Sequence, residues 1–185
     1  MIKNKISFRP FLSRQRLFVW LLSVLVFLPL NLKGQDNFYP TDNRLFHIER
    51  SKNKNLVCYD VRLTDGKFDT KNPLEVYWID REKTPGKRKG LTAIQRRMAY
   101  GYKLITSDNE SAEVTLTAYP GRVLTIRKEH DQYVCLIQIN NRQAILQSLY
   151  VQANPNNSLQ VEYVELHGKD RETGEQLTER VATND

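Results

Sequence analysis

The sequence predicts an all-β fold, an antiparallel β-sandwich or small barrel of about nine strands with one short helical insert. Three observations lead to this prediction. From residue 44 onward, apolar and polar residues mostly alternate with a period of two, as in a half-buried strand. Residues 112–152 hold four such runs, separated by breaks too short for crossover helices. One segment, residues 91–99, places its apolar side chains at helical spacing instead.

The first 34 residues are predicted to be a secretory signal peptide. The first 16 carry five Lys or Arg and no acidic residue, and a mostly apolar stretch of 14 residues follows, from Leu17 to Leu30. A helix of that length spans about 21 Å, less than the roughly 30 Å of a bilayer core. We expect cleavage near Gly34, with an uncleaved membrane anchor as the alternative. The mature protein is then exported, periplasmic or extracellular, and residues 35–185 are expected to form a single β domain.

The predicted signal peptide also contains most of the net positive charge. Of the 28 Lys and Arg residues, six lie in residues 1–34, which contain none of the 21 acidic residues. Without this segment the chain has 22 basic and 21 acidic side chains, so its formal net charge falls from +7 to +1. Because nucleic-acid binding relies on attraction to phosphates, no nucleic-acid partner is expected for the mature chain.

The first strands after the signal are predicted at residues 56–63 and 74–80. In the first run every second side chain from Val57 onward is apolar, and the turn-forming residues 64–67 end it. The second run is rich in aromatic and β-branched residues and starts directly after Pro73. A proline suits the beginning of a strand because it lacks the N–H that an interior position needs.

A helix of two to three turns is predicted at residues 91–99, lying on the sheet. Leu91, Ile94 and Met98 recur at helical spacing, and a glycine lies on each side of the segment. The loop ahead of it, residues 83–89, is basic and is expected to be exposed.

The clearest pattern predicts a four-stranded antiparallel meander. The first turn is placed at Pro120-Gly121, and Asn140-Asn141 supplies the positive φ that a tight hairpin needs. One further strand is expected near the C-terminus, at residues 159–167. The strands of the meander are expected at residues 112–119, 122–129 and 133–140, with a fourth that ends at residue 152.

Cys58 and Cys135 are the only two cysteines. An exported protein meets an oxidising compartment, where a disulfide between them is chemically allowed. Both lie inside strand-like runs, however, where cysteine also occurs as a buried, unbonded thiol. The sequence leaves both arrangements open.

A catalytic function has little support in the sequence. The polar run at residues 47–55 contains His47, Arg50, Ser51 and Asn55, and a hydrolase-like enzyme would use Arg50 and Asn55 to position its substrate. No motif frames Ser51 as a nucleophile, and a strand end followed by a polar turn is the simpler interpretation. No His or Cys pair has the spacing of a zinc site. We therefore predict no catalytic residue, metal or cofactor.

The best candidate for a binding site is the basic, aromatic segment from Trp78 to Lys103. Residues 81–103 contain eight Lys or Arg, with aromatic rings between and beside them. Such charges bind anions, and such rings stack on flat or sugar-like groups. The alternative is that the arginines face water while Trp78 and Tyr100 enter the core. With two residues of the polar run added, the predicted ligand-binding residues are His47, Arg50, Trp78, Lys87, Arg88, Lys89, Arg96, Arg97, Tyr100 and Tyr102.

Several segments form a distinctive set: residues 47–60, 72–79, 99–102, 163–170 and 173–174. Together they resemble a bacterial family of secreted domains of unknown function, the family numbered four-eight-three-three. The resemblance covers roughly residues 45–180. It implies no activity, and no functional residue is carried over from it.

The function predicted from these observations is non-enzymatic binding at the cell envelope, with an anionic glycan or a lipid headgroup as the ligand. A hydrolase-like enzyme that uses the polar run at residues 47–55 is the first alternative. A structural subunit that pairs through an exposed sheet edge is the second. Contact with a membrane is expected only through an uncleaved signal.

Overall fold

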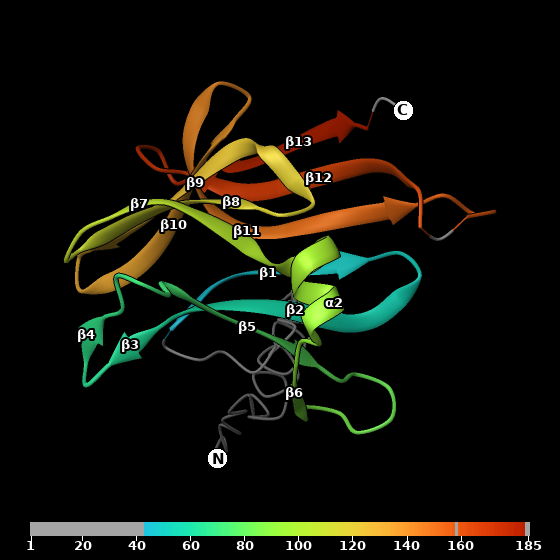
Figure 1. Cartoon of the computed structure of the whole chain (residues 1–185). Coiled ribbons are helices and arrows are strands. Elements are labelled where there is room, and N and C mark those ends of the chain that lie inside the picture. Colours follow the sequence, from blue (N-terminus) through green and yellow to red (C-terminus); the bar gives the residue numbers. More distant parts are fainter. Residues whose placement is uncertain (1–42, 158, 184–185) are drawn as a thin grey trace, which may run out of the picture. The chain divides into compact units, whose positions relative to one another are not determined.

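The computed structural model of this protein describes residues 43–157 and 159–183, all within one compact unit of the chain (Figure 1). The predicted signal peptide and its cleavage site lie outside these residues. Within the part that is described, no helix has the length and apolarity needed to cross a membrane.

Strands make up most of the described chain, which confirms the all-β fold class. The helical insert is a single α-helical turn, α2, that continues directly into a π-helical turn, η1. In chain order the elements are β1 (Arg44–Arg50), β2 (Asn53–Val61), β3 (Leu63–Thr64), β4 (Lys67–Phe68), β5 (Leu74–Ile79), β6 (Arg88–Gly90), α2 (Ala93–Gln95), η1 (Arg96–Tyr100), β7 (Tyr102–Ser107), β8 (Ser111–Leu116), β9 (Tyr119–Glu129), β10 (Gln132–Ile139), β11 (Arg142–Ala153), β12 (Val161–Asp170) and β13 (Gln176–Ala182).

The long strand β11 organises the main sheet. One of its edges pairs antiparallel with β12, which pairs in turn with β13. Along the other edge, the first part of β11 pairs antiparallel with β10 and the second part pairs parallel with β1. Two sets of strands therefore diverge from β11: a first arm, β1-β2-β5-β6, and a second arm, β10-β9-β8-β7.

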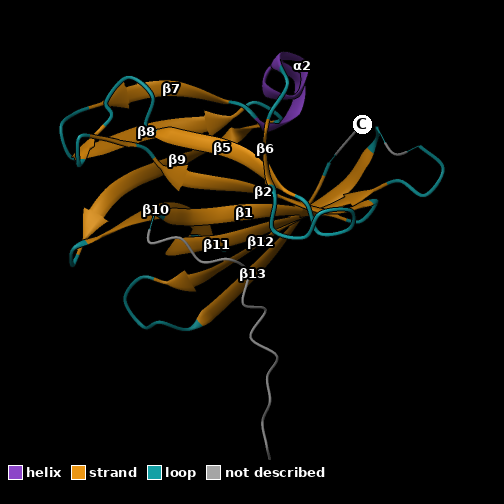
Figure 2. Ribbon diagram, turned by 90° about the horizontal axis from the view of Figure 1, so that it is seen from below, coloured by secondary structure: helices purple, strands orange, loops and turns teal. Residues whose placement is uncertain are grey.

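The two arms curl toward each other into a half-barrel, with the hydrophobic core between them (Figures 1 and 2). Phe46 of β1 and Tyr59 of β2 stack in this core, with ring centroids 4.4 Å apart. This arrangement agrees with the predicted sandwich or small barrel. The parallel pair β1–β11 makes the sheet mixed, because strands about a hundred residues apart are not constrained to the antiparallel pairing of a hairpin.

The predicted meander is confirmed, since β8, β9, β10 and β11 pair antiparallel in sequence order. Positive φ values occur at His130-Asp131 and at Asn140-Asn141, the residues that turn the last two hairpins. The first hairpin differs from the prediction. Leu116 pairs with Tyr119 across a two-residue turn, so Pro120-Gly121 lies inside β9.

The helical insert contacts the core through Tyr100 of η1, but the apolar residues at helical spacing are mostly exposed. Ile94 and Met98 are 75% and 69% exposed, and neither α2 nor η1 contains a buried residue. The last turn is closed by a bond from the Gly101 N–H to the Arg96 carbonyl, five residues back. This π-type turn is wider than an α-helical turn, so the period of 3.6 does not hold from Arg96 onward.

Both cysteines are buried free thiols, so the disulfide considered from the sequence is not formed in the structure. Cys135 of β10 belongs to the core between the arms. Cys58 alternates along β2 with Val57 and Tyr59, which are core residues, so its side chain points to the opposite face. Two thiols on different arms and facing different ways lack the geometry that a disulfide requires.

These thiols should be unreactive in the folded protein. Burial raises the pKa of the Cys58 thiol to about 11 and also raises the pKa of Cys135, so very little reactive thiolate forms at neutral pH. In a protein of residues 35–185, a maleimide reagent should label neither cysteine until denaturant is added. If labelling in denaturant also required a reductant, the two cysteines would be joined after all.

Candidate functional site

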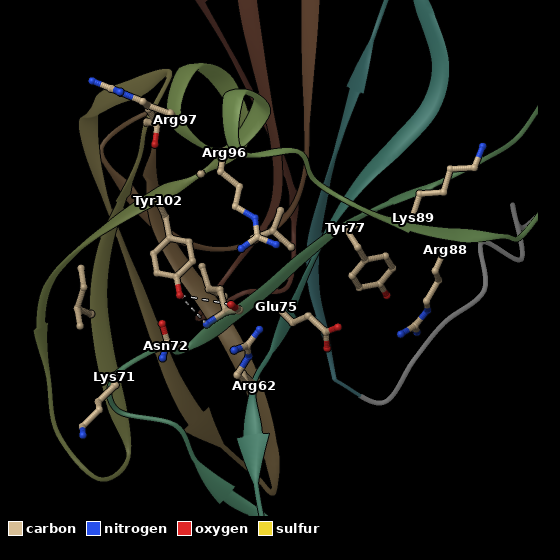
Figure 3. Close-up of a pocket in the computed structure, with 17 residues that line it drawn as sticks. Arg62, Lys71, Asn72, Glu75, Tyr77, Arg88, Lys89, Arg96, Arg97 and Tyr102 are labelled. Carbon is tan, nitrogen blue, oxygen red and sulfur yellow. Dashed lines mark hydrogen bonds between the residues drawn. The ribbon is translucent and has the colours of Figure 1, made fainter.

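A cleft of about 900 Å³ lies where the two arms approach each other without closing the barrel (Figure 3). β5 and β6 of the first arm form one side, and β7 of the second arm faces them. The Tyr102 hydroxyl of β7 spans this seam, donating to the Leu74 carbonyl at 3.3 Å and accepting from the Leu74 N–H at 3.5 Å. A side chain thus bridges the arms where a closed barrel would have a main-chain ladder.

The lining of this cleft, called the basic cleft below, is strongly cationic. Glu75 is the single carboxylate among its lining residues. Arg62 and Arg96 point into the cleft from opposite sides (Figure 3). The full set of lining cations is Arg62, Lys71, Arg88, Lys89, Arg96 and Arg97.

Arg62 and Arg96 are the lining cations that point into the cleft, and no described residue forms a hydrogen bond or ion pair with either guanidinium. Both charges act on Tyr102: burial raises the pKa of this phenol, and the two arginines oppose that shift. The hydroxyl of Tyr102 therefore stays protonated at neutral pH beside two guanidinium groups, of which Arg62 also interacts through space with the Asp69 carboxylate.

The remaining lining cations either contact other residues or point away from the cleft. The Lys89 ammonium donates to Asp80 at 2.7 Å. The Arg88 guanidinium lies over the Tyr77 ring, 4.4 Å from its centroid. The side chains that point away from the cleft in Figure 3 are those of Lys71, Lys89 and Arg97.

Five of the ten residues predicted to bind a ligand line the basic cleft. Trp78 and Tyr100 instead pack against the core, in an edge-to-face contact with centroids 5.0 Å apart, as the alternative interpretation expected. Lys87 is exposed in the loop before β6 and does not line the cleft. The five residues that do are Arg88, Lys89, Arg96, Arg97 and Tyr102.

The polar run at residues 47–55 does not join the basic cleft. Arg50 lines a separate, mainly apolar cavity of about 190 Å³, and His47 lines neither cavity. The Ser51 hydroxyl accepts a hydrogen bond from the Ala153 N–H at 3.0 Å, which ties the turn after β1 to the end of β11. This serine therefore has a structural partner, and the structure does not bring His47 and Arg50 to one concave site.

Sequence reasoning missed Arg62 and Lys71. They flank the small hairpin β3–β4, outside the basic run, and they reach the cleft because β5 begins at the seam. No local pattern marks an isolated arginine after a strand as a site residue. Among the described residues, no group of three or more His, Cys, Asp or Glu side chains is placed to hold a metal ion.

The family of the chain follows from a comparison with known protein families. Residues 46–180 match the model described as "Domain of unknown function (DUF4833)". This span includes the second arm, all but the first two residues of the first arm, and every lining residue of the basic cleft. Searches of curated proteins and of solved structures give no significant match. On the family match, which agrees with the resemblance seen in the sequence, the chain belongs to the DUF4833 family.

Proposed function

We propose that this chain is an exported, envelope-associated domain that binds an anionic glycan or an anionic lipid headgroup in the basic cleft. The observation that carries the proposal is the pair Arg62 and Arg96, which point into the cleft from opposite sides and form no hydrogen bond or ion pair with a described carboxylate. A guanidinium presents two parallel N–H groups to a carboxylate, sulfate or phosphate. Two of them on opposite sides favour a ligand group with several anionic oxygens.

The shape of the site supports the same conclusion. A cavity of about 900 Å³ is within the usual range for small-ligand sites, and its position at the seam leaves it open to solvent. An open cleft accepts one charged unit of a longer glycan or the headgroup of a lipid that remains in its bilayer. Export, predicted from the first 34 residues, would place the cleft where both kinds of ligand occur.

The test is to remove both arginines in a protein of residues 35–185. We expect Arg62→Ser with Arg96→Ser to weaken binding to a heparin oligosaccharide, or to vesicles containing phosphatidylglycerol, by up to roughly thirtyfold. This follows from about 1 kcal/mol for each exposed ion pair that is lost. The affinity is measured by calorimetry for the oligosaccharide and by co-sedimentation for the vesicles, and the probe that binds identifies the ligand class.

The matched control is Lys87→Ser with Lys103→Ser, which removes the same charge from residues that do not line the cleft. This variant should bind nearly as well as the unmodified protein. Equal losses in the two double variants would mean that binding depends on net charge alone and would overturn the proposed site.

A further inference from the structure

A second, smaller cavity of about 210 Å³ lies beside the basic cleft and shares Lys89 with its lining. Asn53 and Asn55 come from β2, on the same side of the strand as the core residue Val57. The remaining lining residues come from β5, the loop after it and α2. They are Trp78, Asp80 and Gln95.

The three amide side chains of this pocket use their oxygens inside the protein. Asn53 Oδ1 accepts from the Asn55 N–H, Asn55 Oδ1 from the Arg81 N–H, and Gln95 Oε1 from the Thr92 N–H, each at 2.9 Å. Of the two ends of an amide side chain, only the oxygen can accept from a main-chain N–H. These bonds therefore assign the positions of the oxygen and of the NH₂ group in each side chain. The three NH₂ groups are left as donors without an acceptor in the described chain.

The one carboxylate of the pocket has no capacity left for a ligand. Asp80 Oδ1 accepts from the N–H groups of Glu82 and Lys83, and Oδ2 accepts from Thr84 Oγ1 and Lys89 Nζ. The hydrogen bond from Lys89 is the main cause of the lowered pKa of Asp80, so the group is ionised at neutral pH. Lys89 uses one of its three protons in this contact and keeps two for another acceptor.

Trp78 adds a further donor without an acceptor, since its buried indole N–H has no hydrogen-bond partner among the described residues. The available polar groups of the pocket are thus donors: three amide NH₂ groups and the ammonium of Lys89. A neutral sugar hydroxyl donates as well as accepts, but the Asp80 oxygens are fully occupied and each amide oxygen already accepts one main-chain N–H. A carboxylate or phosphate group only accepts at neutral pH, apart from a residual phosphate proton, and matches such a lining.

We infer that this pocket is a binding site for a single oxyanion, a carboxylate or a phosphate group. The site goes beyond the proposed function, because none of its donors belongs to Arg62 or Arg96. Lys89 lines both cavities, so the pocket adjoins the basic cleft.

The test uses the fluorescence of Trp78, which is the single tryptophan of residues 35–185 because the other one is Trp20. The protein is titrated at constant ionic strength with inorganic phosphate, with glucuronate and with glucose. Saturable changes in emission with phosphate or glucuronate, and none with glucose, are expected, and the anion that responds distinguishes phosphate from carboxylate ligands. Equal saturation by glucose, or no response to either anion, would overturn the inference.

Two variants convert a donor of the pocket into a carboxylate while keeping the internal hydrogen bond. Asn55→Asp still accepts from the Arg81 N–H, and Gln95→Glu still accepts from the Thr92 N–H, but each replaces the free NH₂ with a negative oxygen. Each should lose at least about tenfold in anion affinity through like-charge repulsion. Thermal melts that match the unmodified protein exclude misfolding as the cause.

The matched control is Asn109→Asp, which makes the same charge change in the turn between β7 and β8. That turn lies at the other end of the fold from the turn between β1 and β2 in Figure 1. The Asn109→Asp variant should leave the fluorescence titration unchanged, and so should the variant with Arg62→Ser and Arg96→Ser. If Asn55→Asp and Gln95→Glu bind phosphate and glucuronate as tightly as the unmodified protein, the pocket is not the site, whatever the outcome at the basic cleft.

Discussion

Replacing Phe46 by alanine should lower the free energy of unfolding of the domain by about 3–5 kcal/mol, the usual cost of removing a buried aromatic ring. Phe46 is 1% exposed and stacks on Tyr59. It lies on β1, the strand that joins the first arm to β11. The loss is measured by urea unfolding of residues 35–185, and the melting temperature should fall by roughly 6–20 °C.

The conservative change Phe46→Leu keeps most of the buried volume and should cost much less, under about 2 kcal/mol. If alanine and leucine at this position lowered the free energy of unfolding by the same small amount, Phe46 would not lie in a packed core between the arms. The half-barrel described above would then be incorrect.

Gly101→Ala should damage both stability and anion binding. A Cβ at this position would lie 2.1 Å from the Arg96 carbonyl oxygen and 2.9 Å from its carbon, and both are main-chain atoms that no rotamer change can move. The π-helical turn must therefore open, at a cost of about 1–3 kcal/mol. Since η1 starts at Arg96 and β7 follows with Tyr102, opening it displaces two groups of the basic cleft.

The same measurements check this variant: urea unfolding for stability and calorimetry with a heparin oligosaccharide for affinity. Gly121→Ala is the control, because a Cβ there meets nothing within 4 Å. Unchanged affinity in a destabilised Gly101→Ala variant would show that the position of Arg96 does not matter for binding.

The parts of the fold that could be predicted from the sequence depend on neighbouring residues. The β8–β11 meander follows from short breaks between alternating runs, and Asn140-Asn141 has the side chains that tolerate positive φ. Strand β5 begins at Leu74, directly after Pro73, as predicted. Each of these features is determined within a few residues of chain.

The rest depends on contacts between distant segments. The parallel pairing of His47 with Ser148 joins residues about a hundred positions apart, and no local pattern specifies it. Strand β13 was not predicted, because its polar, charged sequence is stabilised by pairing with β12 rather than by burial. The basic cleft was predicted only in part: Arg96 lies in the basic run, whereas Arg62 reaches the cleft through the pairing of β2 with β5.

The proposed function requires that the open seam between the two arms binds an anionic group. This is tested by an amide NMR titration of isotope-labelled residues 35–185 with a heparin oligosaccharide, in which each residue other than proline reports separately. If the basic cleft binds the oligosaccharide, the largest shifts appear at Arg62, at Leu74–Val76, and from Arg96 to Tyr102, on both sides of the cleft. Shifts centred instead on β12 and β13, or spread evenly over all exposed lysines, would contradict it.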